Sequence, residues 1–277
     1  MRVALTIAGS DTSGGAGLQA DLKTFASLGV YGLSVTTAIT AQSTVGVVDA
    51  AALSADLVTA QIEAVAGDID VHAVKTGMLG TAAIVEAVAA AIQDLELPFV
   101  VVDPVLSSSR GDRLLDDDGV QMLRTELLPL AHVVTPNVPE AEVLSGKRID
   151  SDDDLKEAAR RIHGMGAAAV VITGGHRPRA DGHQPPATGH RPPEVIDVLF
   201  DGSRFLEFHT ARVDSGSAHG TGCAFAAAIA AYLALGRPLD DAAERAQRYV
   251  AAAIRNRLVI GHGQALLNHF WGGILKE

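Results

Sequence analysis

The chain has 277 residues, 48% of them hydrophobic and 20% charged, which is the composition of a globular protein and excludes a disordered or fibrous chain. A formal net charge of −11 and a sequence pI near 5.3 argue against a nucleic-acid partner, which would require a basic face. The single cysteine cannot form an internal disulfide, and the apolar run near the N-terminus is too short for a membrane span. We therefore expect one cytoplasmic domain over residues 1–277 that binds small solutes and no membrane.

Short β-branched runs alternate along the chain with longer amphipathic segments rich in alanine and leucine. Strands are predicted at Val3–Ala8, Leu33–Thr40, Ala73–Thr76, Phe99–Val102, Val133–Thr135 and Ala169–Thr173, followed by a hairpin of Val195–Phe200 and Arg204–His209. Helices are predicted at Leu18–Ser27, Ala55–Ala66, Thr81–Asp94, Asp118–Leu128 and Leu155–Met165. This alternation is typical of βα units around a buried, mostly parallel sheet, so we predict an α/β fold.

Two further segments carry local signals. Ser151 followed by three aspartates resembles a capping box and predicts that a helix begins there. The segment 177–194 is rich in proline, glycine and charge, with little to bury, so it predicts a loop. Such a loop is either a flap over a site or a solvated insertion.

The stretch HGTGC opens a second alanine-rich helix near the C-terminus and contains Gly220, Thr221, Gly222 and Cys223. Glycines allow a tight turn, and the unpaired amides of a new helix then point toward an anion. This arrangement favours a site for a transferring phosphoryl group. A helix N-terminus also lowers a thiol pKa from about 8.5 toward neutrality, which would make Cys223 a proton acceptor. The alternative is a small buried cysteine beside a helix cap.

A first glycine-rich stretch, AGSDTSGGAG, follows the first strand and precedes a helix. It lacks the Gly-Lys-Ser/Thr ending of a P-loop and the spacing of a dinucleotide fingerprint. Its glycines are therefore predicted to shape the rim of a substrate site.

Carboxylates follow two later strands, Asp103 in DPV and Glu140 in TPNVPE. Ligands of open α/β sheets collect at the carboxyl edge, where both carboxylates could hold a hydrated Mg²⁺, which often keeps waters between itself and the protein. The alternative is that Asp103 and Asn137 cap the following turns. The histidines lack zinc-site spacing, and His219 is singled out only because it precedes the HGTGC glycine.

Taken in order, the motifs AGSDTSGGAG, QADLKTF, TAITAQST, KTGMLG, DPV, TPNVPEAE, GGH and HGTGC resemble the ribokinase superfamily over nearly the whole chain. The resemblance is closer to the hydroxymethylpyrimidine and phosphomethylpyrimidine kinases of thiamine biosynthesis. It implies a three-layer α/β/α sandwich, ATP and Mg²⁺ as cofactors, and a homodimer. It also implies two successive phosphorylations of an aminopyrimidine alcohol, first to the monophosphate and then to the diphosphate.

The same resemblance assigns roles to individual residues. It implies that Asp21 and Gln42 hydrogen-bond the aminopyrimidine and that Gly9, Met78 and Val105 enclose its ring. It places Gly220 to Cys223 around the transferring phosphate, with Cys223 as the base of the first step. Asn137, Thr173 and His219 would lie near the nucleotide phosphates, and Asp103 and Glu140 near the metal.

The chain departs from the family pattern where a lysine commonly precedes Gly-Gly-His, because Thr173 stands there. The run before HGTGC also lacks the usual lysine. Both losses predict weaker support for the negative charge that accumulates in the second phosphorylation, unless Lys75 or a loop arginine compensates.

Two other functions fit the same motifs. Pyridoxal kinases are related members that phosphorylate a pyridine alcohol in a similar pocket, so pyridoxal kinase activity or dual activity is the first alternative. A non-catalytic pyrimidine-binding protein that lost phosphate chemistry with its lysines is the second.

Overall fold

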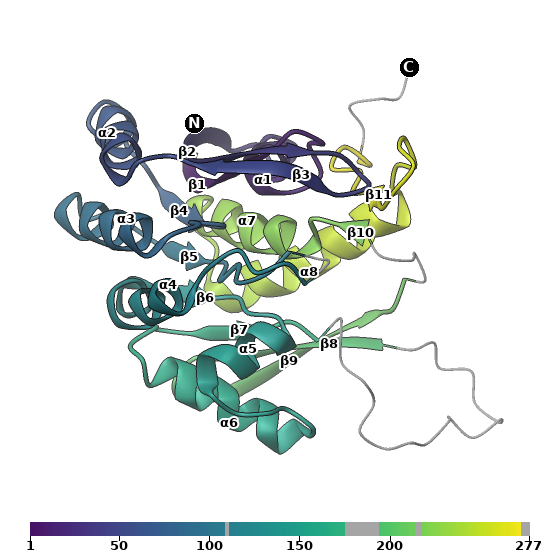
Figure 1. Ribbon diagram of the computed structural model, residues 1–277. Coiled ribbons are helices and arrows are strands. Elements are labelled where there is room, and N and C mark those ends of the chain that lie inside the picture. Colours follow the sequence, from purple (N-terminus) through teal and green to yellow (C-terminus); the bar gives the residue numbers. More distant parts are fainter. Residues whose placement is uncertain (109–110, 175–193, 214–217, 273–277) are drawn as a thin grey trace, which may run out of the picture.

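A computed structural model describes residues 1–108, 111–174, 194–213 and 218–272, and a nine-stranded sheet runs through its centre (Figure 1). The strand order is β3-β2-β1-β4-β5-β6-β7-β8-β9. The strands are β1 Val3–Asp11, β2 Tyr31–Gln42, β3 Val47–Ala52, β4 Ala73–Thr76, β5 Val100–Val102, β6 Val133–Val134, β7 Val170–Ile172, β8 Glu194–Phe200 and β9 Phe205–Ala211. A separate short pair joins β10 Ala218–His219 to β11 Ala265–Leu266.

The sheet is mostly parallel, as the sequence predicted. Strands β2, β1, β4, β5, β6 and β7 pair in parallel, whereas β3, β8 and β9 each pair antiparallel with the neighbour that precedes them in the chain. The carboxyl ends of the six parallel strands therefore meet along one edge, where loops gather functional side chains.

Helices cover both faces of this sheet (Figure 1). They are α1 Gly17–Ser27, α2 Ala55–Ala66, α3 Ala82–Asp94, α4 Asp117–Met122, α5 Val138–Ser145, α6 Asp152–His163, α7 Thr221–Ala234 and α8 Leu239–Arg255. Side chains alternate along β5, with Val100 and Val102 packed in the cluster under α2 to α6, and Val101 in the cluster under α1, α7 and α8. Successive residues of β5 therefore pack against helices on opposite faces, so the sheet is the middle of three layers. A strand buried on both faces in this way is apolar at every position.

Two predicted helices are found at their predicted positions, one with its predicted cap and one with a change of helix type. Ser151 accepts a hydrogen bond from the Asp154 amide at the start of α6, which confirms the predicted cap. The segment predicted as Asp118–Leu128 begins as α4 and continues as a wider π turn over Leu123–Leu127.

Five elements were not predicted from the sequence: β3, α5, α8 and the two-residue strands β10 and β11. Strand β3 escaped because all six residues are exposed, so its apolar residues show no buried alternation. Helix α5 is only eight residues long, and α8 was not singled out. The predicted loop at 177–194 lies outside the described residues except for Glu194, which begins β8.

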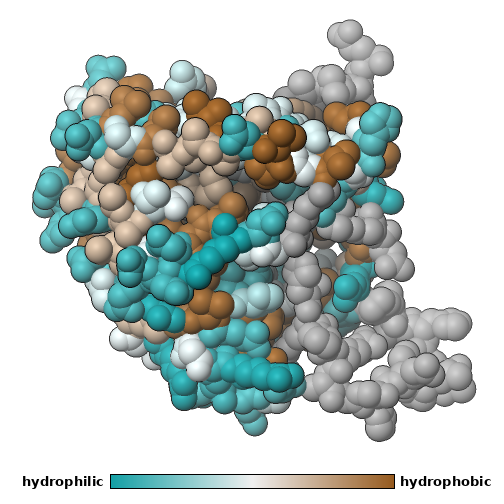
Figure 2. All heavy atoms as spheres, viewed as in Figure 1, coloured by the Kyte–Doolittle hydropathy of each residue, from teal (hydrophilic) through white to brown (hydrophobic). Residues whose placement is uncertain are grey.

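An apolar surface runs along the β2–β3 ribbon, in the upper part of Figure 2. Its exposed residues include Val45, Val47 and Val48, and Val259 and Ile260 are exposed on the C-terminal segment. That segment is tied to the ribbon because Gln264 donates its amide hydrogen to the Thr44 carbonyl. Within the described residues, no helix is both long and apolar enough to cross a membrane. The cytoplasmic location stays a prediction.

Buried polar contacts join α1 to α8 and the C-terminal segment. His269 is 3% exposed, and its Nδ1 lies 3.2 Å from Thr24 Oγ1 and 3.1 Å from the Tyr249 hydroxyl. Burial, together with the nearby Lys23 charge, lowers the pKa of His269 to about 4. The folded protein therefore holds this imidazole neutral.

Because the pKa of His269 is depressed on folding, its protonation favours the unfolded chain as pH falls from 6.5 toward 4. We predict that this residue alone lowers the free energy of unfolding by about 2 kcal/mol between pH 7.5 and pH 5. Urea unfolding of the parent and of His269→Asn at both pH values measures it. An equal loss in both proteins would contradict the prediction.

Candidate active site

The predicted site residues gather at the carboxyl edge of β1, β4, β5 and β6 and at the start of α7. Asp103 follows β5 directly, and Gly77 and Met78 follow β4. Asn137 comes three residues after β6. Parallel pairing brings these loops side by side, so residues far apart in the sequence share one surface.

A buried lysine joins two of the predicted carboxylates. Lys75 is fully buried; its Nζ donates to Asp21 Oδ2 at 2.9 Å and lies 3.5 Å from Asp103 Oδ2. Thr6 Oγ1 also donates to Asp21 Oδ2, at 2.6 Å. Burial opposes charge on Lys75, but the carboxylates outweigh it and raise the pKa of the lysine, which is held as the ammonium. Burial also raises the pKa of both aspartic acids against the pull of Lys75.

Asp21 is less accessible than the ring-binding prediction requires. Its residue is fully buried, and Oδ1 has no hydrogen-bond partner. A ligand would reach this oxygen only if neighbouring atoms moved. In the described state, Asp21 serves as the counterion of Lys75, and its ring-binding role stays a prediction.

Cys223 lies beside this charge cluster, as third residue of α7. Its side chain is partly exposed, but desolvation raises the pKa of the thiol to about 12. The Asp103 and Asp21 carboxylates also raise this pKa, and Lys75 opposes the rise only in part. The predicted lowering toward neutrality is therefore wrong. Two nearby carboxylates and desolvation dominate over the positive end of the helix.

Gly220 makes the turn that presents the α7 N-terminus. It caps the helix in the left-handed conformation, with φ 85°, and a Cβ there would collide with the Gly15 carbonyl oxygen. The first intrahelical bond runs from the Ala224 amide to the Gly220 carbonyl, so the amides of residues 221–223 have no partner within the helix. We call residues 220–223 the anion turn. The geometry provides the donors that the sequence predicted.

Asp11, the last residue of β1, organises the first glycine-rich loop and connects it to the anion turn. Its Oδ2 accepts from the Ala16 amide at 2.9 Å and lies 3.0 Å from His219 Nε2, while Oδ1 accepts from the Ser13 amide at 2.8 Å. Burial opposes ionisation, but donors from His219 and Ser13 outweigh it and lower the pKa of Asp11. The sequence analysis missed this residue, although an acid at the carboxyl end of a strand was a usable signal.

Gln42 and His219 meet at the end of β2. Gln42 Nε2 lies 3.0 Å from His219 Nε2, and Gln42 Oε1 lies 3.2 Å from Thr40 Oγ1. Thr40 Oγ1 also donates to the Ser10 carbonyl at 2.8 Å. The structure thus joins Gln42, predicted to bind the ring, to His219, predicted to lie near phosphate.

Three residues predicted to enclose the ring lie on neighbouring strand ends. Gly9 falls at an irregularity in the β1–β2 pairing, and a Cβ at this position would collide with Met78 Cε. Val105 helps to line a hollow of about 10 Å³ that Asp103 and Gly77 also line. The hollow beside Val105 is therefore too small for a ring in the described state, and the enclosing role of these three residues stays a prediction.

Asn137, Glu140 and Thr173 form a second group. Asn137 and Glu140 make a reciprocal capping box at the start of α5, each side chain accepting the other's backbone amide at 2.9 Å. Thr173 pairs with Asn137 in an isolated parallel bridge. The capping alternative is thus confirmed for Asn137, and its nucleotide role stays a prediction.

Glu140 is buried near Asp103, and burial, with the Asp103 charge adding to it, raises the pKa of Glu140 to about 8. Asp103 Oδ2 receives no hydrogen bond. A divalent cation would relieve the repulsion between these two carboxylates, so both fit a magnesium site. The part of the chain that the structure describes contains no cluster of three or more His, Cys, Asp or Glu suited to a metal, which is compatible with a cation held mainly through water.

Asp197 on β8 is a buried carboxylate that the sequence analysis did not select. Its Oδ1 accepts from the Gly174 amide at 2.8 Å, and its Oδ2 accepts from Gln247 Nε2 at 2.9 Å. It therefore holds the backbone at Gly174, directly after Thr173. Periodicity gave no signal for it, because its partners are distant in sequence.

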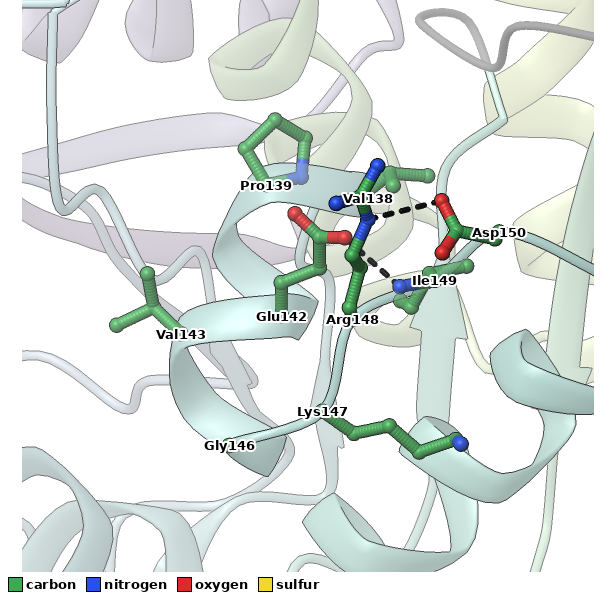
Figure 3. A pocket seen from close by; sticks show the side chains of 9 residues that line it. All are labelled: Val138, Pro139, Glu142, Val143, Gly146, Lys147, Arg148, Ile149 and Asp150. Atoms are coloured by element: carbon green, nitrogen blue, oxygen red, sulfur yellow. Dashed lines mark hydrogen bonds and ion pairs between the residues drawn. The ribbon is translucent and has the colours of Figure 1, made fainter.

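A broad hollow of about 670 Å³ lies elsewhere, between α5 and the segment that leads into α6 (Figure 3). Glu142 and Arg148 line it. Glu142 accepts a hydrogen bond from the Ile149 amide at 2.7 Å, and Arg148 forms an ion pair with Asp150 at 2.9 Å. None of the predicted site residues lines this hollow. The convergence of charges at the strand ends, not the size of this hollow, identifies the candidate site.

Comparisons with known proteins agree with this geometry. The family model described as phosphomethylpyrimidine kinase matches residues 11–268. The chain is 46% identical over 267 residues to the hydroxymethylpyrimidine/phosphomethylpyrimidine kinase of Bacillus subtilis, covering 96% of this chain and 94% of that one. It is 47% identical to a thiamine biosynthesis bifunctional protein of Geobacter sulfurreducens, covering 96% of this chain but only 51% of that protein.

Among solved structures, an ADP complex of Bacillus subtilis pyridoxal kinase is similar, with a TM-score of 0.86, 38% identity and 97% coverage of both chains. The predicted α/β sandwich of the ribokinase-like kind is thereby confirmed.

Gly220 and Gly236 offer a matched test of the anion turn, because both have positive φ but only Gly220 is crowded by a neighbouring backbone atom. Gly236→Ala should cost about 1 kcal/mol of unfolding free energy from its φ alone. Gly220→Ala should cost at least about 2 kcal/mol more, because Gly15 must also move. Urea unfolding measures both, and equal losses would mean that the contact with Gly15 does not hold the turn.

The raised pKa of Cys223 can be read directly, because the chain has only one thiol. The rate of alkylation by iodoacetamide should rise about tenfold per pH unit from pH 7 to pH 10, since only the thiolate reacts. The rate is followed by mass spectrometry. A plateau near pH 7 would restore the lowered pKa that the helix N-terminus suggested.

Proposed function

Because the chain belongs to the phosphomethylpyrimidine kinase family, we propose that it phosphorylates 4-amino-5-hydroxymethyl-2-methylpyrimidine with ATP, first to the monophosphate and then to the diphosphate, for thiamine biosynthesis. The observation that carries the proposal is the anion turn of residues 220–223, which presents unpaired amides beside Lys75, Asp103 and Cys223. Such fixed donors stabilise the charge that spreads over a transferring phosphoryl group.

Cys223 is the group we assign to the alcohol proton in the first transfer. The resting thiol is protonated, so it can take the alcohol proton only as it passes its own proton to the Asp103 carboxylate, to which it is hydrogen-bonded. In the second transfer the monophosphate is already an oxyanion, so positioning and charge stabilisation suffice. Thr173 in place of a lysine is expected to make this second transfer the slower one.

For substrate binding we propose that Gln42 hydrogen-bonds the pyrimidine, with Asp21 reaching the ring if the pocket rearranges. Gly9, Met78 and Val105 would enclose the ring. The contact of Met78 with Gly9 and the shared hollow at Val105 support this. Apolar walls and a few convergent polar groups are what a small heteroaromatic ligand requires.

For nucleotide binding we propose that Asn137, Thr173 and His219 lie near the ATP phosphates, while Asp103 and Glu140 hold Mg²⁺ through water. Bound there, the cation would offset the negative charge of the phosphates. The protein's own share is to keep the two carboxylates together, through the Asn137 capping box and through Lys75.

Pyridoxal is the second candidate substrate, because the pyridoxal kinase of Bacillus subtilis shares the fold at 38% identity. Its ring is similar in size, and an aldehyde near Cys223 could add the thiol reversibly. We place it after the pyrimidine because the family match and the 46% identical relative favour the pyrimidine kinase.

We also propose a homodimer. The exposed apolar surface on the β2–β3 ribbon supports it, since Val47 and Val48 lie on a sheet-edge strand that has no further neighbour in the described residues. Apolar edge strands of this kind pair readily with a second chain.

The test is mass-resolved product formation with ATP, Mg²⁺ and either the hydroxymethylpyrimidine or pyridoxal. We expect pyrimidine monophosphate and then diphosphate, and little pyridoxal phosphate. Cys223→Ala should slow the first transfer by about a hundredfold or more, as expected for loss of a general base, and the second by far less.

Each other outcome has a definite meaning. Equal slowing of both transfers by Cys223→Ala would remove its role as base. Pyridoxal phosphate as the main product would reverse the order of substrates, and binding of the pyrimidine without ATP turnover would indicate a non-catalytic binder.

A further inference from the structure

We propose that Thr40, His219 and Asp11 fix the orientation of the Gln42 carboxamide, so that Gln42 presents an N–H donor to a ring nitrogen of the substrate. The inference rests on the proposed function, in which Gln42 binds the ring. It assigns Thr40, His219 and Asp11 as positioning residues, since they act through Gln42.

Thr40 determines one end of the amide. Its hydroxyl has a single hydrogen, which goes to the Ser10 carbonyl at 2.8 Å, so Oγ1 can only accept from Gln42, 3.2 Å away. The structure places Oε1 at Thr40 and Nε2 at His219, whereas this count of hydrogens assigns the NH₂ group to the end that faces Thr40. The two ends of a carboxamide have the same shape, and only such partners distinguish them.

His219 and Asp11 determine the other end. Asp11 is ionised and accepts only, and its Oδ2 lies 3.0 Å from His219 Nε2, so Nε2 carries a hydrogen. Gln42 lies 3.0 Å from the same nitrogen. If the amide NH₂ group of Gln42 faced His219, two N–H hydrogens would point at each other. The amide oxygen of Gln42, in contrast, can accept the Nε2 hydrogen together with Asp11. Both ends thus give the same orientation: oxygen toward His219, nitrogen toward Thr40.

This orientation decides what Gln42 offers a ligand. With the carboxamide turned to this orientation, one N–H points to Thr40 Oγ1 and the other is left for a ligand. A ring nitrogen of the aminopyrimidine is an acceptor and matches this donor, whereas the exocyclic amine, itself a donor, does not. Gln42 therefore recognises a ring nitrogen.

The same chain of contacts links ring recognition to the phosphate chemistry. His219 directly precedes the anion turn, and Asp11 holds both His219 and the loop whose Gly15 carbonyl packs against Gly220. A shift of Gln42 would therefore displace the anion turn, although Gln42 and Gly220 are 178 positions apart in the sequence.

The experiment measures steady-state constants for both substrates in variants of the full chain. Thr40→Val removes the acceptor without changing shape and should raise the KM for the pyrimidine roughly three- to tenfold, with the KM for ATP unchanged. His219→Leu should raise it similarly, and His219→Gln, which keeps an N–H near the Nε2 position, should restore it to within about twofold. Thr24→Val, which loses a buried hydroxyl on α1, is the matched control and should leave both constants unchanged.

A measurement without substrate tests the same arrangement. In ¹⁵N-labelled protein, His219 should carry a hydrogen on Nε2, and an Nε2 without hydrogen would overturn the inference. So would an unchanged pyrimidine KM in Thr40→Val, or a change confined to the KM for ATP. Failure of the parent protein to phosphorylate the pyrimidine would instead reject the proposed function, and the ¹⁵N result would still decide the hydrogen-bond order.

Discussion

The buried ammonium of Lys75 is the interaction on which the candidate site depends. It lies between Asp21 and Asp103, which come from α1 and from the end of β5, and it joins these elements to β4. Without it, two carboxylates would stand unpaired in the core, where such charges are strongly destabilising. The same charged groups surround Cys223, so a change in the charge balance of the core would also change the pKa of the thiol.

A second carboxylate, Asp11, holds the site from the other side. Its oxygens accept amides of the first glycine-rich loop and contact His219, which directly precedes the anion turn. A Cβ on Gly220 would collide with the Gly15 carbonyl oxygen, and a Cβ on Gly15 would collide with the side chains of Leu266 and His219, so both segments need glycine at this point. The N-terminal loop and the anion turn are therefore one unit, and a change in one must be accommodated by the other.

Much of this was predictable residue by residue. Six parallel strands were located because their β-branched runs stand out between the helical segments, and Ser151 was located as a cap because the signal is local. The exposed strand β3 was not located, because an edge strand without a buried face leaves no pattern. Asp197 was not singled out, because its importance comes from Gly174 and Gln247, which lie far from it in sequence.

The amino-acid sequence alone established the fold class, the order of the motifs and the residue types at the anion turn, because these depend on local periodicity, on glycine and on family resemblance. The tertiary structure set the pKa of Cys223, which local reasoning lowered and which desolvation and the surrounding carboxylates raise. It likewise decided that Asp21 is committed to Lys75 and that Gln42 lies beside His219. Electrostatic energies depend on distance and desolvation, and these exist only once the strands have brought distant residues together.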